Sequence, residues 1–273
     1  MDILNMTQTC KEMDLPICRV LKNSVPLYTA RPLEILSLRI YSPATILLLC
    51  FTIISTLWII PKVNKHYSAI GRKELMMFFY LYIISAMLEM VLISNLLDSV
   101  NSGLIIYLIS LQISFANSAF FCLFVGAVTA NIFLGGVGIA SLVIVRIATA
   151  IYFLVSLAVI FSSLIEKNSI IIFGATFIVN GMFAIAYVLV QSLRLINMDA
   201  EVWAYGTLGI AFLFFCLGVI PMFYGSKYIA YVSERYLDGV FFFHLFIFSS
   251  ILMIHKFWLS TCENEAECTD LWM

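Results

Sequence analysis

The chain has 273 residues, of which 63% are hydrophobic and 11% are charged, and its formal net charge is −1. A soluble domain is typically about 45–50% apolar and about 25% charged, so this chain has too few charges to cover a water-soluble globule. The balanced charge argues against a nucleic-acid partner, because phosphates are bound through a surplus of Lys and Arg. We therefore expect an all-α, polytopic integral membrane protein whose surroundings are the lipid bilayer.

Residues 1–42 are predicted to form a tail that precedes the membrane domain. The opening stretch, MDILNMTQTC, lacks the basic start and compact apolar core of a cleavable signal peptide. Asn5 begins the sequon Asn-Met-Thr, which is glycosylated only in the lumen. Cys10 and Cys18 either pair as a disulfide in an oxidising compartment or remain free thiols. The sequon and the cysteines favour a luminal tail.

Residues 43–259 are predicted to form a transmembrane domain of seven helices. A helix needs roughly 20 mostly apolar residues to cross a bilayer core, and continuous apolar runs indicate helices rather than barrel strands, in which residues alternate. The uncharged interval 99–145 is too long for one span, so we place a tight loop in NIFLGGVG, residues 131–138; a re-entrant segment there would change the topology. The predicted spans are Ala44–Ile60, Leu75–Leu97, Leu104–Ala130, Ile139–Ile165, Ile170–Leu193, Val202–Gly225 and Val240–Trp258.

The first loop sets the expected orientation. Its short sequence PKVNKHYSAIGRK, residues 61–73, is rich in Lys and Arg and is predicted to be cytosolic by the positive-inside rule. Seven spans then put the N-terminus in the lumen and the C-terminus in the cytosol, where residues 260–273 form a short acidic tail. The N-terminal tail also carries basic residues, so an unweighted count of positive charge does not favour this orientation.

Two ionisable side chains, Glu89 and Arg146, lie inside predicted spans. A charged side chain at the centre of a span costs roughly 2.5–3.5 kcal/mol on insertion scales, so each needs a partner. We interpret them as an intramembrane polar pair that joins two helices. The alternative for Glu89 is a proton or substrate site.

An enzyme is not predicted. His66 lies in a loop, and His244 and His255 are about three helical turns apart, which is too far for a shared metal ion. Neither an HExxH motif nor a histidine pair one turn apart is present. We therefore expect no catalytic residue, no metal and no cofactor.

A seven-span receptor or transporter is the alternative function. Residues 234–236, Glu-Arg-Tyr, are similar to the E/D-R-Y triplet of rhodopsin-like receptors, but they precede the last span instead of following the third. A transporter would have interrupted helices at matching positions of two halves. Pro221 interrupts the sixth predicted span without a counterpart in the first half.

Two blocks of sequence resemble the fungal chitin synthase export chaperone family. KHYSAIGRKELMMFFYLY, residues 65–82, is similar to the family's first loop and second helix, and RYLDGVFFFHLFIFSSILMIHKFWLS, residues 235–260, looks like its final helix. A weaker block contains the pair Cys10 and Cys18, and Arg146 falls where the family has an arginine in its fourth helix. The residues that carry the resemblance are Tyr67, Gly71, Arg72, Lys73, Glu74, Tyr236, Asp238, Gly239, Lys256, Phe257 and Trp258.

The resemblance implies a chaperone of the endoplasmic reticulum membrane. Such a protein assists the folding of a chitin synthase and its export toward the cell surface, and so supports chitin and cell-wall synthesis. Its implied partners are the chitin synthase, itself a multi-span protein, and the export-coat machinery. Residues 134–136, Leu-Gly-Gly, and Leu259 depart from the family pattern, which indicates a divergent member.

The matched residues also have local structural interpretations. In G-R-K-E, residues 71–74, the bases would anchor the second helix at the headgroups, and Glu74 would lie where the helix dipole favours an acid; the same stretch is a candidate for docking a client domain or export machinery. Asp238 is a candidate N-cap of the last helix. Lys256 and Trp258 fit an interfacial anchor pair.

Small residues on the third predicted span offer a surface for close helix packing. In lipid there is little hydrophobic drive between helices, so specific association depends on close packing and polar contacts. The surface would serve either a client helix or, as we favour, packing inside the bundle. Its members are Ser114, Ala116, Ser118 and Ala119.

Overall fold

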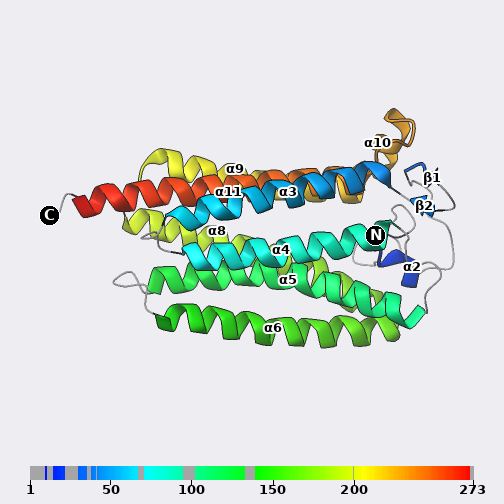
Figure 1. The fold of residues 1–273 in the computed structure, drawn as a ribbon, viewed down its shortest axis with the longest axis horizontal. Coiled ribbons are helices and arrows are strands. Elements are labelled where there is room, and N and C mark those ends of the chain that lie inside the picture. The colour runs from blue at the N-terminus through cyan, green and yellow to red at the C-terminus, as the bar shows by residue number, and fades with distance from the viewer. Residues whose placement is uncertain are drawn as a thin grey trace.

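The computed structural model describes residues 10, 15–21, 30–35, 38–40, 42–66, 71–94, 102–132, 139–198 and 200–270. The long helices run side by side along one axis (Figure 1). Within the described residues, seven helical stretches are long and apolar enough to cross a membrane. The prediction of an all-α protein with seven transmembrane helices is therefore confirmed.

Helices and π-helical segments (η) together form the seven spans. In chain order they are α3 (Pro43–Lys65), α4 (Arg72–Ile93), α5 (Ser102–Ile132), α6 (Ile139–Ile165), the series α7 (Ser169–Phe173), η1 (Gly174–Ile178) and α8 (Val179–Asn197), then α9 (Val202–Ile220) with η2 (Pro221–Gly225), and α11 (Gly239–Asp270). The remaining elements are α2 (Cys18–Leu21), α10 (Ser226–Val232), and the antiparallel pair β1 (Leu33–Ile35) and β2 (Leu38–Ile40), in which Leu33 lies opposite Ile40.

Several helices extend beyond the apolar runs that predict them. Lys62 and Lys65 belong to the last turn of α3, where the negative end of the helix dipole favours bases. The last helix continues to Asp270, so the first part of the predicted acidic tail is helical. The uncharged interval 99–145 contains two separate spans, α5 and α6, and most of the predicted loop between them lies outside the described residues.

The sixth span changes its hydrogen-bonding pattern at Pro221. Proline has no backbone N–H and its ring clashes with the preceding turn, so an α-helix cannot continue unchanged through it. The chain forms the π-helical segment η2 there and then the short helix α10. This interruption turns α10 away from the bundle axis (Figure 1).

The helix α5 is central to the bundle. It packs against α4, α6 and α8, whereas α9 packs mainly on α11, and α11 also contacts α3. Outward-facing side chains on α6 and α8 are large and apolar, for example Ile151 and Leu189, which are 57% and 60% exposed. Such surfaces suit contact with lipid, in which the helix satisfies its own backbone hydrogen bonds.

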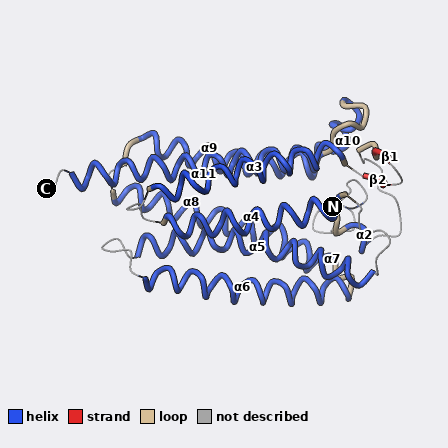
Figure 2. The backbone as a smooth tube through the Cα atoms, viewed as in Figure 1, coloured by secondary structure: helices blue, strands red, loops and turns tan. Residues whose placement is uncertain are grey.

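The two ends of the bundle differ in their elements. The end that carries α2, β1, β2 and α10 lies opposite the C-terminus, and the loop between α3 and α4 lies at the same end as the C-terminus (Figure 2). We call the first the N-terminal end and the second the C-terminal end. An odd number of spans accounts for this arrangement.

Candidate functional site

The two blocks that carry the family resemblance meet at the C-terminal end. Gly71 precedes α4 with a left-handed φ of 77°, a conformation that favours glycine. A Cβ at this position would lie 3.8 Å from the indole Nε1 of Trp258 on α11. The ring of His66 packs edge-on against the Trp258 ring, with centroids 5.9 Å apart. The first loop and the last helix therefore form one structure.

A small polar pocket of about 40 Å³ lies beside this contact. Glu74, in the first turn of α4, lines it together with Gln191 and Arg194 of α8, and all three are buried. An acid and a base thus share one enclosed space, and their opposite charges reduce the cost of burying each other. A Cβ at Gly126 would lie 3.3 Å from Glu74 Cβ, so α5 approaches α4 closely here.

Basic side chains surround the meeting point. Arg72 Nη1 donates a hydrogen bond to the backbone carbonyl of Asn64 at 3.2 Å, which ties the start of α4 to the end of α3. Lys65 and Lys73 are exposed. We call the group of Lys62, Lys65, Arg72, Lys73 and Lys256 the basic face.

The expected anchor pair of Lys256 and Trp258 is wrong. Trp258 is 7% exposed and packs inside the bundle. The exposed tryptophans are instead Trp58 and Trp203. Lys62 Nζ lies 3.1 Å from the Trp58 ring centroid, and Lys256 Nζ lies 5.8 Å from that of Trp203, which are the pairs suited to the headgroup region.

The remaining motif residues lie at the N-terminal end, away from the basic face. Asp238 Oδ1 accepts a hydrogen bond of 2.8 Å from the Phe241 backbone N–H and so caps α11, as expected for an N-cap. A Cβ on Gly239 would overlap Ser226 Oγ and lie 2.7 Å from the carbonyl oxygen of Pro221, so close contact with η2 and α10 requires glycine. These two positions shape the start of the last span.

Tyr236 marks where the N-terminal tail contacts the bundle. Its ring lies 5.5 Å from the guanidinium carbon of Arg31, and the Arg31 backbone N–H donates to the carbonyl of Arg235 at 2.8 Å. Tyr236 is 62% exposed. The predicted partner residues therefore divide between the two ends. Tyr67, like Asn5, lies outside the described residues.

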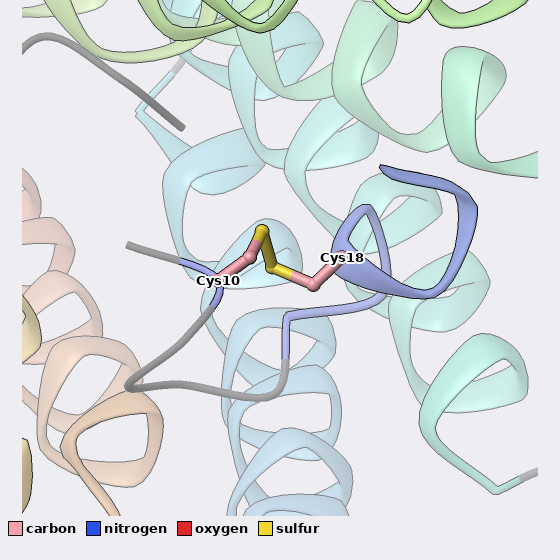
Figure 3. The surroundings of a disulfide bond; sticks show 2 residues. All are labelled: Cys10 and Cys18. Carbon is pink, nitrogen blue, oxygen red and sulfur yellow. A yellow bond between two sulfur atoms is a disulfide. The ribbon is translucent and has the colours of Figure 1, made fainter. Parts of the chain in front are cut away.

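Cys10 and Cys18 are joined by a disulfide, with their Cα atoms 5.3 Å apart (Figure 3). Both cysteines are buried, together with Leu15 and Ile17, in a hydrophobic cluster that includes Ile113 of α5 and residues of several other spans. The cross-linked loop is thus packed on the bundle. Closing so short a loop removes conformational freedom from the unfolded tail and favours this packed arrangement.

The predicted pair of Glu89 and Arg146 is wrong. Glu89 Oε1 lies 3.1 Å from His244 Nε2 of α11, and Glu89 Oε2 accepts a hydrogen bond of 3.3 Å from Gln112 Nε2 of α5. Arg146 is exposed near the start of α6, at the C-terminal end. A long side chain near a helix end reaches the headgroups without a partner in the core. The Glu89 contacts join α4, α5 and α11.

A second polar network joins α5 to α6 and α8. Asn117 Nδ2 donates to Ser156 Oγ at 3.0 Å, and Asn180 Nδ2 donates to Asn117 Oδ1 at 2.7 Å. Such hydrogen bonds between helices contribute about 0.6 kcal/mol each on average in a membrane. Together with the Glu89 contacts, they fix α5 at the centre of the bundle.

The small-residue surface of α5 faces inward. Ser114 and Ser118 are fully buried, and each donates its hydroxyl to the carbonyl four residues earlier. Ala119 is buried too. The favoured interpretation, internal packing, therefore holds for these residues, and they do not form an outer surface for a client helix.

Comparison with known proteins decides what this arrangement belongs to. The sequence model of the chitin synthase export chaperone family matches residues 2–269. The chain belongs to the chitin synthase export chaperone family. This match covers nearly the whole chain and confirms the family inferred from the two sequence blocks.

Relatives described as chitin synthase export chaperones are similar over most of their length. A protein of Coccidioides immitis is 26% identical over 94% of this chain and 82% of its own length. One from Gibberella zeae is 26% identical over 96% and 83%, and one from Neurospora crassa is 25% identical over 96% and 77%. No solved structure matches the chain.

Membership of a chitin synthase export chaperone family makes the chain a chaperone and not an enzyme. The receptor or transporter alternative fails on the same finding. The Glu-Arg-Tyr triplet also lies apart from the third span: Glu234 and Arg235 have positive φ values and are exposed between α10 and α11.

Sequence reasoning missed two residues of this export chaperone's polar interior. His244 was considered only as a metal ligand, yet it is the partner of Glu89. Arg194 was left outside the predicted spans, yet it is buried beside Glu74. The available signal was the position of each polar residue within or at the end of an apolar run, and this signal does not say which helices touch.

Proposed function

We propose that this chaperone resides in the membrane of the endoplasmic reticulum, where it holds a chitin synthase during folding and supports its export toward the cell surface. The family description supports a chitin synthase client. A client that is itself multi-span would be recognised through helix contacts in lipid and through loops at the membrane surface. The product of this assistance would be chitin for the cell wall.

The meeting of the two motif blocks is the observation that carries this proposal. The Gly71–Trp258 contact fixes the first turn of α4 against the last helix. The Arg72 hydrogen bond to Asn64 holds the loop in place from the other side. A rigid support of this kind presents Lys65 and Lys73 in a constant arrangement, which a docking surface needs because ordering flexible side chains and loops opposes binding.

The charge of the basic face indicates the chemistry of its partner. An exposed group of Lys and Arg is complementary to an acidic segment, and electrostatic complementarity sets specificity and the rate of encounter. We propose an acidic cytosolic segment of the chitin synthase as the bound partner. The export-coat machinery is the second candidate for the same face. Lys62, which stacks on Trp58, serves the headgroup region as well.

Reversing one exposed charge on this face tests docking. Lys73→Glu is expected to reduce client binding about tenfold, because a favourable contact worth up to about 1 kcal/mol is replaced by repulsion. The chitin synthase should then accumulate in the endoplasmic reticulum, measured by microscopy of a tagged client in cells lacking the native chaperone. The matched control is Lys227→Glu, an exposed base on α10 at the opposite end. Normal export with Lys73→Glu would reject docking through this face.

We also propose that the basic face is cytosolic and that the disulfide end is luminal. The disulfide supports this orientation because such bonds persist in oxidising compartments. In sealed microsomes, added protease should remove an epitope at the C-terminus and leave one at the N-terminus intact. Asn5→Gln should abolish a glycan on the tail. The opposite protection pattern would contradict the orientation, whereas protection without a glycan would reject only use of the sequon.

A further inference from the structure

A cavity of about 330 Å³ lies within the bundle. Its walls come from α4, α5, α8, α9 and α11 among others, and residues Leu15, Pro16 and Ile17 of the disulfide-linked loop line it at the N-terminal end. The volume falls in the range of about 300–1,000 Å³ that is usual for small-molecule sites, which often lie between the helices of bundles.

Most of the cavity wall is apolar, but a few polar groups converge on it. The Glu89, Gln112 and His244 contact group lines one part, and Thr176 and Asn180 line another. Thr176 Oγ1 and Asn180 Oδ1 are buried and have no hydrogen-bond partner among the described residues. Asn180 is only 7% exposed. A buried oxygen without a donor costs about 1–3 kcal/mol, so a ligand that supplies an O–H or N–H would be stabilised there.

The charges of the wall exclude an anionic head. None of the described residues that line the cavity is Lys or Arg, and the carboxylate of Glu89 is among them. A phosphate would therefore be buried without a countercharge and near a like charge, which is costly in a low-dielectric interior. The apolar walls and unpartnered acceptors instead suit a neutral, largely apolar ligand with a hydrogen-bond donor.

A second pocket of about 40 Å³ adjoins the cavity on the side of α8 and α9. The two share Phe120, Leu123 and Phe215 as wall residues. The outer faces of both helices are apolar and exposed, for example at Ile185 and Leu213. The membrane itself is therefore the source from which such a ligand would enter.

We propose that this cavity binds a neutral membrane lipid whose head carries a hydroxyl or amide donor. The donor would bind Asn180 Oδ1 or Thr176 Oγ1, and the apolar body would lie against the phenylalanine-rich walls. A sterol, a ceramide and a diacylglycerol share this chemistry. The inference goes beyond the proposed chaperone function and does not depend on it, because the observations concern the cavity alone.

Photo-crosslinking of the purified full chain tests the proposal. The chain is reconstituted in lipid nanodiscs with photoactivatable, clickable analogues of a sterol, a ceramide, a diacylglycerol or phosphatidylcholine, and labelled peptides are identified by mass spectrometry. We expect at least one of the three hydroxyl-bearing lipids to label cavity residues of α5 or α8, and phosphatidylcholine to label only the outer faces. The three separate arms identify the lipid.

Two variants keep the test specific. Thr176→Val preserves side-chain shape and should reduce cavity labelling about fivefold, as expected for loss of a hydrogen bond worth about 1 kcal/mol. Ala116→Phe, which fills the cavity, should abolish it. The control Ile185→Val lies on the outer face of α8 and should leave labelling unchanged. Equal labelling by phosphatidylcholine, unchanged labelling in both cavity variants, or labelling displaced by added chitin synthase would overturn the proposal.

Discussion

His244→Leu is expected to destabilise the bundle by about 3–5 kcal/mol, the usual cost of removing one partner from a buried ion pair. His244 Nε2 lies 3.1 Å from Glu89 Oε1, and both residues are buried. Without the imidazole, the Glu89 carboxylate retains only the Gln112 amide as a donor among the described side chains. The measurement is the midpoint of thermal unfolding in mild detergent, followed by size-exclusion chromatography of the heated protein.

A double-mutant cycle separates the pair from general packing effects. Glu89→Gln should be tolerated, because a neutral amide removes the buried charge and still hydrogen-bonds. Glu89→Leu combined with His244→Leu should recover most of the stability lost in His244→Leu, since apolar replacement of both partners is often neutral. A double variant no more stable than His244→Leu would show that the pair is not the cause. Loss of client export by Glu89→Gln at normal protein levels would instead indicate a proton-relay role.

Gly239→Ala is expected to cost about 3 kcal/mol, the upper end of the range for overpacking. The added Cβ would overlap Ser226 Oγ and lie 2.7 Å from the carbonyl oxygen of Pro221. The serine can rotate, but the proline carbonyl belongs to the backbone of η2 and cannot move without shifting the sixth span. The expected result is a lower unfolding midpoint and a smaller yield of folded protein.

Gly206→Ala is the matched control for this prediction. Gly206 lies within α9, and a Cβ there would meet nothing within 4 Å. Alanine is favoured over glycine in a helix by about 1 kcal/mol, so this variant should be as stable as the parent chain or slightly more so. Equal behaviour of Gly239→Ala and Gly206→Ala would mean that the start of α11 is not tightly packed on η2.

Composition and apolar runs predict the spans of this protein because the bilayer imposes a length and an apolar surface on every spanning helix. They also predict the local role of Asp238, since an N-cap depends only on the residues that follow it. These features are set by neighbours in sequence or by the solvent. The family blocks add the class of function, which residue patterns alone leave open.

Pairings between helices could not be predicted in the same way. Glu89 and Arg146 are the charged residues inside the predicted spans, so an ion pair between them is the simplest expectation, but the fold brings His244 to Glu89 and leaves Arg146 exposed. Trp258 has the sequence setting of an interfacial residue, yet α11 turns it onto Gly71. Which face of a helix meets which neighbour depends on packing of the whole bundle.

The central claim is that the basic face, supported by the Gly71–Trp258 contact, binds a chitin synthase. Affinity capture of the tagged full chain from membranes in mild detergent tests it most directly, with the amount of co-purified chitin synthase measured by quantitative mass spectrometry. We predict that the parent chain and Lys227→Glu retain the enzyme equally and that Lys73→Glu retains about one tenth as much. Equal recovery with all three chains, or no chitin synthase with the parent chain, would contradict the account.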